Sequence, residues 1–274
     1  MNNTYQIYLI SDSTGETLDR IFLAIKAQFK KFNYKIHYYS FSRTENQILK
    51  ILNIAKQQKN SIILYTIVDS NLASFLGKES DKIKIPCFGI LGDLILSFSK
   101  LLKQEATHLP SGQHELNAEY YDKIEALQFT MKHDDGNSIK DLEKSDIILL
   151  GVSRTSKTPT SIYLANKGFR TSNIPLVNEN SIPDILKKKP KITCVVGLTT
   201  EAERLAEVRK NRLNTIKETE KTDYTNINKI KKEVEEAKKT FKKYRWPTID
   251  MTRKSVEETA ASIMKIHEIF KNDN

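Results

Sequence analysis

The chain has 274 residues, 39% of them hydrophobic, and none of its apolar runs is long enough to span a membrane. This length suits one large domain or two modest domains with proper cores. The formal net charge is +10, but the lysines are scattered among glutamates, and no basic–aromatic recognition motif is present. The N-terminus enters an apolar run without the basic region of a signal peptide. We therefore expect a cytoplasmic protein that binds neither membranes nor nucleic acid, and whose positive charge suits a phosphorylated ligand or an acidic protein partner.

Strand-like and helical patterns alternate along the first half of the chain. Apolar runs predict strands at residues 5–10, 35–41, 61–68 and 85–91. Apolar spacing of three and four residues predicts helices at residues 16–29, 45–57, 71–76 and 94–102. A loop at residues 105–117 is long enough for a lid or a connection between lobes, and a helix at residues 119–132 follows it.

The second half alternates in the same way. Strands are predicted at residues 146–151, 174–177 and 192–198, and helices begin near residues 159 and 201, at residue 228 and at the capping box of Ser255 and Glu258. The order predicts an α/β fold with mostly parallel, doubly wound sheets in two lobes, the second of which carries the P-loop-like motif described below. We place the N-terminal lobe at residues 1–140 and the C-terminal lobe at residues 141–274.

The sequence predicts a phosphate-binding loop at Gly151-Val152-Ser153-Arg154-Thr155-Ser156-Lys157-Thr158. The loop joins a strand-like run to a helical stretch, so backbone N–H groups at the helix start would surround phosphate oxygens. Lys157 would reach the outer phosphates, and Thr158 would place its hydroxyl on Mg²⁺. Ser156 stands where the usual motif has its second glycine, and its Cβ restricts positive φ, which predicts a tighter or differently shaped loop. The alternative is a polar turn in which Lys157 faces solvent.

A second candidate phosphate cradle follows the first strand, at Ser11-Asp12-Ser13-Thr14-Gly15-Glu16-Thr17. Open α/β sheets bind ligands at the carboxyl ends of their strands, and a helix start beside several hydroxyls suits phosphate. The spacing of Ser13 and Glu16 also fits a simple capping box, which needs no ligand. An aspartyl-phosphate enzyme with Asp12 as nucleophile fits poorly, because Glu16 separates Gly15 from Thr17.

Two adjacent acids, Asp134 and Asp135, follow the predicted helix at residues 119–132 in the run His-Asp-Asp-Gly. Carboxylates at a helix C-terminus oppose the helix dipole, so they suggest Mg²⁺ coordination or proton abstraction from a hydroxyl. The alternative is a turn with ordinary Asp-Asp-Gly chemistry. Arg154 suits the charge on a transferred phosphoryl group, or an ion pair with a nearby carboxylate.

With these motifs in view, the chain resembles the bacterial pyruvate, phosphate dikinase regulatory proteins. The resemblance covers nearly the full length and rests on four blocks in order, at residues 10–17, 129–136, 151–164 and 245–260. Ser156 belongs to the loop pattern of that family. The resemblance implies a bifunctional regulator that uses ADP to phosphorylate a threonine beside the dikinase's catalytic histidine, which inactivates the dikinase. Inorganic phosphate reverses this reaction, with release of pyrophosphate.

On this resemblance, residues 151–158 would bind the diphosphate of ADP, with Lys157 on the transferred phosphoryl group and Thr158 on Mg²⁺. Asp134 or Asp135 would accept the proton of the target threonine. The candidates for inorganic phosphate are Ser11, Ser13, Thr14 and Arg154.

Several alternatives stay open at this point. A related group of proteins regulates phosphoenolpyruvate synthase by the same chemistry, although residues 160–168 look more like the dikinase group. A nucleotide sensor without transferase activity and a small-molecule kinase are the two rivals from other classes. A homodimer stays open too, because the sequence does not decide the oligomeric state.

Overall fold

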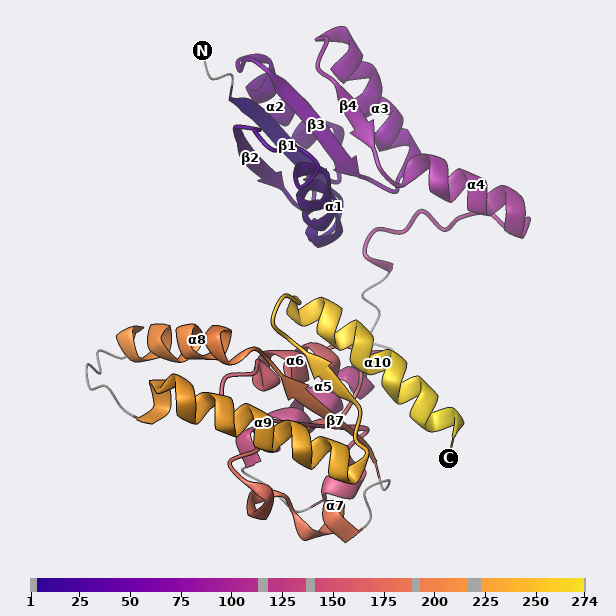
Figure 1. Cartoon of the computed structure of the whole chain (residues 1–274). Helices are drawn as coiled ribbons and strands as arrows, with labels where there is room; N and C mark the ends of the chain where they lie inside the picture. The colour runs from indigo at the N-terminus through magenta and orange to yellow at the C-terminus, as the bar shows by residue number, and fades with distance from the viewer. Residues whose placement is uncertain (1–3, 113–117, 137–140, 189–192, 216–222, 274) are drawn as a thin grey trace. The chain divides into compact units, whose positions relative to one another are not determined.

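The computed structural model describes residues 4–112, 118–136, 141–188, 193–215 and 223–273. It divides into two compact units, Met1–Glu115 and Leu116–Asn274 (Figure 1). The division therefore falls before helix α5 (Ala118–Lys132) and not near residue 140, where we expected it. The reason is that the end of α5 bonds to the second unit: the Thr171 N–H donates to Thr130 Oγ1 at 3.0 Å, and the Asn173 N–H donates to the His133 carbonyl oxygen at 3.0 Å.

The N-terminal unit has one parallel sheet with helices on both faces. Alternate side chains of its first strand point to opposite faces: Ile7 and Leu9 pack in one cluster with helix residues Leu18 and Phe22, and Tyr8 packs in the other. The sheet order is β2-β1-β3-β4. The strands are β1 (Tyr5–Ser11), β2 (Tyr34–Tyr39), β3 (Ser61–Thr66) and β4 (Cys87–Gly89). The helices are α1 (Glu16–Lys26), α2 (Glu45–Lys56), α3 (Ser70–Lys82) and α4 (Gly92–Leu102).

The C-terminal unit repeats this plan with the parallel order β6-β5-β7-β8. Ile148 and Leu150 pack with Phe241 on one face, and Leu149 packs with Leu164 on the other. The strands are β5 (Ile147–Gly151), β6 (Thr171–Pro175), β7 (Cys194–Thr199) and β8 (Thr248–Asp250). The further helices are α6 (Lys157–Ala165), α7 (Asp184–Lys188), α8 (Ala202–Thr215), α9 (Ile227–Tyr244) and α10 (Val256–Asn272).

Each sheet has a topological switch point at its first strand. The second strand lies on one side of the first and the third strand on the other, so the connections leave β1 and β5 in opposite directions. Open α/β sheets bind ligands in the crevice at such a point, outside the carboxyl ends of the strands. The loops that follow β1 and β5 are the two that the sequence predicts to bind phosphate.

The predicted fold class is confirmed, since both sheets are parallel and each unit alternates strands with helices. The capping box of Ser255 and Glu258 is confirmed as well, with hydrogen bonds of 3.1 and 2.8 Å. The capping box at Ser13 and Glu16 is wrong: Gly15 precedes α1 in a left-handed conformation, and no side chain caps the helix. Within the described residues, no helix is long and apolar enough to cross a membrane.

The sixth strand begins earlier than its apolar run suggests. We predicted a strand at residues 174–177, whereas β6 starts at Thr171. Its first residues are polar yet fully buried, because they bond to the end of α5. These buried polar contacts lie beside the predicted phosphate loop.

Candidate functional site

The predicted phosphate loop leaves β5 at Gly151 and enters α6 at Lys157. Gly151 leaves no room for a side chain, since a Cβ there would lie 2.6 Å from Thr155 Oγ1 and 2.7 Å from the Leu198 carbonyl oxygen. The Thr155 hydroxyl donates to the Val152 carbonyl oxygen at 2.9 Å. The loop is therefore closed tightly onto its own backbone and onto the neighbouring strand.

Ser156 adopts the left-handed conformation that a glycine has in the generic motif. Its φ is 54° and its ψ is 26°, and Arg154 has a φ of 73°. A residue with a Cβ pays about 1–2 kcal/mol for this conformation, and such strain is typical of functional sites. No side chain caps the start of α6, and no acidic residue lies in its first turn. Its first N–H groups therefore remain donors for an anion.

Lys157 is buried inside the loop. Its side chain donates to the Val152 carbonyl oxygen at 3.0 Å, and only 5% of the residue is exposed. Burial lowers the pKa of Lys157 to about 8, and the nearby Asp135 and Asp134 partly oppose this. The alternative of a solvent-facing lysine is wrong. A partly desolvated ammonium group next to free N–H donors is suited to phosphate oxygens.

The side chains of Asp134 and Thr158 bond to each other and share a buried asparagine as a partner. The Thr158 hydroxyl donates to Asp134 Oδ1 at 3.1 Å, and the Asn173 side-chain amide donates to both Asp134 Oδ1 and Thr158 Oγ1. Asn173 is 1% exposed, so it holds these two groups in place. The hydroxyl and carboxylate oxygens fit a hard cation such as Mg²⁺. Asp135 is exposed, has a φ of 52°, and lies close enough to act on the charge of Lys157.

Arg154 contacts a tyrosine rather than a carboxylate in the part of the chain that the structure describes. Its Nε donates to the Tyr224 hydroxyl at 3.2 Å, and Ser153 Oγ lies 3.4 Å from the same oxygen. The buried Arg209 bonds to the backbone of both Ser153 and Tyr224. It donates to the Ser153 carbonyl oxygen at 3.3 Å, to the Tyr224 carbonyl oxygen at 3.1 Å and to Glu233 Oε2 at 2.7 Å.

Three residues of this site, Asn173, Arg209 and Tyr224, were not predicted. Arg209 belongs to a highly charged stretch that reads as a solvated helix, yet it is 2% exposed. Tyr224 lies in a polar connection without any motif. Of the three, only Asn173 could have been suspected from the sequence, because it belongs to a polar run directly before a predicted apolar strand.

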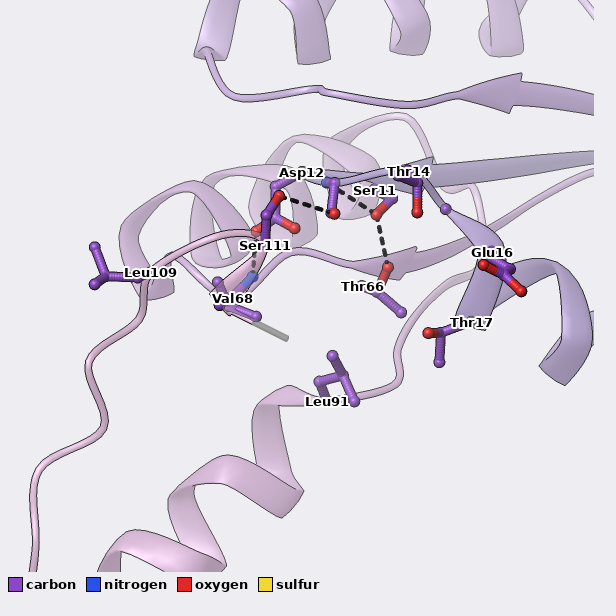
Figure 2. A pocket seen from close by; sticks show the side chains of 13 residues that line it. Ser11, Asp12, Thr14, Glu16, Thr17, Thr66, Val68, Leu91, Leu109 and Ser111 are labelled. Carbon is purple, nitrogen blue, oxygen red and sulfur yellow. Dashed lines mark hydrogen bonds between the residues drawn. The ribbon is translucent and has the colours of Figure 1, made fainter. Parts of the chain in front are cut away.

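The second predicted cradle, from Ser11 to Gly15, lies at the carboxyl end of β1 in the N-terminal unit (Figure 2). Ser11 and Asp12 are each 3% exposed, and all five residues line a cavity of about 260 Å³. The Val68 N–H donates to Asp12 Oδ2 at 2.7 Å. Burial raises the pKa of the Asp12 carboxyl above its ordinary value. Arg154, the other candidate for inorganic phosphate, belongs to the C-terminal unit.

Comparison with known proteins assigns the chain to a family. A family model described as kinase/pyrophosphorylase matches residues 7–264. A protein of Pelagibacter ubique, named as a pyruvate, phosphate dikinase regulatory protein, is 70% identical over 273 residues and covers 100% of both chains. Proteins of the same name from Sphingopyxis alaskensis and Rhizobium meliloti are each 43% identical and cover 96% of this chain and of their own. The chain therefore belongs to the kinase/pyrophosphorylase family.

Proposed function

We propose that this protein regulates a pyruvate, phosphate dikinase in both directions: it phosphorylates a threonine of the dikinase with ADP and removes that group with inorganic phosphate. The family description and the names of the relatives support this proposal. The observation that carries it is the convergence of Lys157, Thr158 and Asp134 at the start of α6, next to uncapped N–H groups. Phosphoryl transfer requires mainly this kind of positioning and charge neutralisation.

In the kinase reaction, residues 151–158 hold the diphosphate of ADP. The Lys157 ammonium exchanges the Val152 carbonyl oxygen for the β-phosphoryl group, and Arg154 contacts the same group. Mg²⁺ would neutralise further phosphate charge, with the Thr158 hydroxyl and the Asp134 carboxylate as its ligands. The threonine oxygen attacks the β-phosphorus, the bond from this phosphorus to the bridging oxygen breaks, and AMP leaves.

Asp135 is the general base in this scheme. Asp134 is tied to Asn173 and Thr158, whereas Asp135 is exposed and accessible to a protein substrate. Its carboxylate accepts the proton of the threonine hydroxyl. In the dephosphorylation reaction, an oxygen of inorganic phosphate attacks the phosphothreonine phosphorus, and the bond from this phosphorus to the threonine oxygen breaks. Pyrophosphate leaves, and Asp135 passes the proton that phosphate carried to the threonine oxygen.

The direct test incubates this protein with purified pyruvate, phosphate dikinase, Mg²⁺ and ADP labelled with ³²P in its β-phosphate. We expect label on a dikinase threonine and its release as pyrophosphate when inorganic phosphate is added. Asp135→Asn should bind ADP but transfer no label, and Lys157→Ala should lose ADP binding. The matched control is Lys167→Ala, which alters an exposed lysine just beyond the same helix.

Three outcomes would contradict the proposal. Binding of ADP without label on any protein would indicate a nucleotide sensor. Label on phosphoenolpyruvate synthase but not on the dikinase would show that the same chemistry acts on a different protein. Consumption of ADP with a small metabolite, and no labelled protein, would indicate a small-molecule kinase.

A further inference from the structure

Arg154 is an exposed arginine whose side chain has a single hydrogen-bond partner among the described residues. Its Nε donates to the Tyr224 hydroxyl oxygen at 3.2 Å, and its charge lies close enough to act on that of Lys157. An arginine side chain has high rotamer entropy, so without a partner its guanidinium group would occupy many positions. The contact with Tyr224 restricts it to one of them.

The bond through Nε leaves the rest of the guanidinium group available. Arginine has five N–H donors, and Tyr224 uses the one on Nε. The donors on the two terminal nitrogens of Arg154 have no hydrogen-bond partner in the part of the chain that the structure describes. Such a planar pair of donors matches the oxygens of a phosphoryl group. The Tyr224 hydroxyl therefore orients this pair without occupying it.

Tyr224 is itself held in place by the buried Arg209. The guanidinium carbon of Arg209 lies 4.6 Å from the centroid of the Tyr224 ring, and its Nη1 donates to the Tyr224 carbonyl oxygen at 3.1 Å. Its Nη2 donates to the carbonyl oxygen of Ser153, the residue before Arg154, at 3.3 Å. One guanidinium group thus fixes the tyrosine relative to the predicted phosphate loop.

Stability alone does not account for an arginine at position 209. The residue is 2% exposed, and its Nε is buried without a hydrogen-bond partner among the described residues. Glu233 on α9 balances the charge at 2.7 Å, and α9 lies beside α8, which carries Arg209 (Figure 1). Apolar residues of similar volume are often at least as stabilising as a buried ion pair. The contacts of Arg209 with Tyr224 and Ser153 give it a role beyond stability.

We propose that Tyr224 is a positioning residue for phosphoryl transfer: its hydroxyl group holds the Arg154 guanidinium in the orientation that stabilises the phosphoryl group during transfer. Charge that is oriented in advance acts mainly on the transition state. Binding of the diphosphate depends instead on Lys157 and on the N–H groups at the start of α6. The inference rests on the proposed function, because that function brings Arg154 to the transferred group.

The test measures the transfer of ³²P from β-labelled ADP to purified dikinase by Tyr224→Phe and by the unaltered protein. Phenylalanine keeps the ring on Arg209 and removes only the hydroxyl group. We expect kcat to fall by about tenfold, because a hydrogen bond to a charged group is lost. KM for ADP should change by less than about threefold, whereas a distorted loop would raise it strongly.

Tyr244→Phe is the matched control. Tyr244 is the last residue of α9, and its hydroxyl group donates to Glu179 Oε1 at 2.8 Å rather than to the predicted phosphate loop. The control therefore loses a tyrosine hydrogen bond in the same unit, and its kcat should equal that of the unaltered protein. A kcat of Tyr224→Phe that also equals that of the unaltered protein would overturn the inference.

A double-substitution cycle tests whether Tyr224 acts through Arg154. Arg154→Gln should lower kcat by about a hundredfold, because the charge at the phosphoryl group is lost. The combination of Arg154→Gln with Tyr224→Phe should be no slower than Arg154→Gln alone, because the tyrosine then has no guanidinium group to hold. A further loss of about tenfold in the double variant would show independent effects and would contradict the proposed role.

NMR of the protein labelled with ¹⁵N-arginine tests the contact without turnover. The Arg154 Nε signal, assigned by its absence in Arg154→Gln, should shift in Tyr224→Phe and exchange its proton with water faster. An unchanged signal would show that Tyr224 does not hold Arg154. If the unaltered protein labels no protein, the proposed function fails, and the role of Tyr224 in transfer fails with it. The Arg154 signal would still show whether the contact exists.

Discussion

The buried charge of Lys157 destabilises the folded state, and the size of this effect can be worked out from the structure. Only 5% of the residue is exposed, and burial lowers its pKa from 10.5 to about 8. At 1.36 kcal/mol for each unit of pKa change, this difference corresponds to about 3 kcal/mol of folding free energy. The informative perturbation is Lys157→Met, which keeps a long side chain and removes the charge.

The sign of the effect follows from the direction of the pKa change. The native state binds the lysine proton less tightly than the unfolded state, so the cost is present in full below pH 8 and disappears as the pH rises to 10.5. Lys157→Met also loses the hydrogen bond to the Val152 carbonyl oxygen, worth about 1 kcal/mol. We therefore expect the variant to be about 2 kcal/mol more stable at pH 7, and about 1 kcal/mol less stable at pH 10.5.

The assay is urea denaturation followed by tryptophan fluorescence at several pH values. Trp246 is the only tryptophan of the chain, is 6% exposed and lies in the core of the C-terminal unit, so its signal reports the unfolding of that unit. Lys167→Met, at an exposed position just beyond the same helix, is the control and should show no such pH dependence. An equal stability difference between Lys157→Met and the unaltered protein at pH 7 and pH 10.5 would refute the reasoning.

Two further substitutions probe the same site. Ser156→Gly should raise the free energy of unfolding by about 0.5–1 kcal/mol in the same urea assay, because relief of the left-handed strain exceeds the entropic cost of glycine; a loss of stability would show that Ser156 is not strained. Asn173→Ala should lower the rate of the proposed threonine phosphorylation by roughly tenfold to a hundredfold, since Asp134 and Thr158 lose a shared donor. Unchanged initial rates, equal to those of an Asn166→Ala control, would remove Asn173 from the site.

Most of the local structure was predictable because local patterns determine it. Apolar runs and helical spacing placed the strands β1 to β5 and β7 and most of the helices within a few residues. The candidate phosphate loop could be proposed from the sequence because its residues are consecutive. Predictions failed where tertiary contacts intervened: α5 bonds to the second unit, and Ser13 Oγ lies 2.9 Å from Ser111 Oγ instead of capping α1.

The sequence by itself determined the fold class, both candidate phosphate loops and the resemblance to a regulatory family, because each depends on residues near one another in the chain. Only the tertiary structure decided that Asp134 and Thr158 share Asn173 as a partner, and that the buried Arg209 bonds to the candidate phosphate loop. These contacts join residues far apart in the sequence. They depend on strand order and helix packing, which side-chain periodicity does not encode.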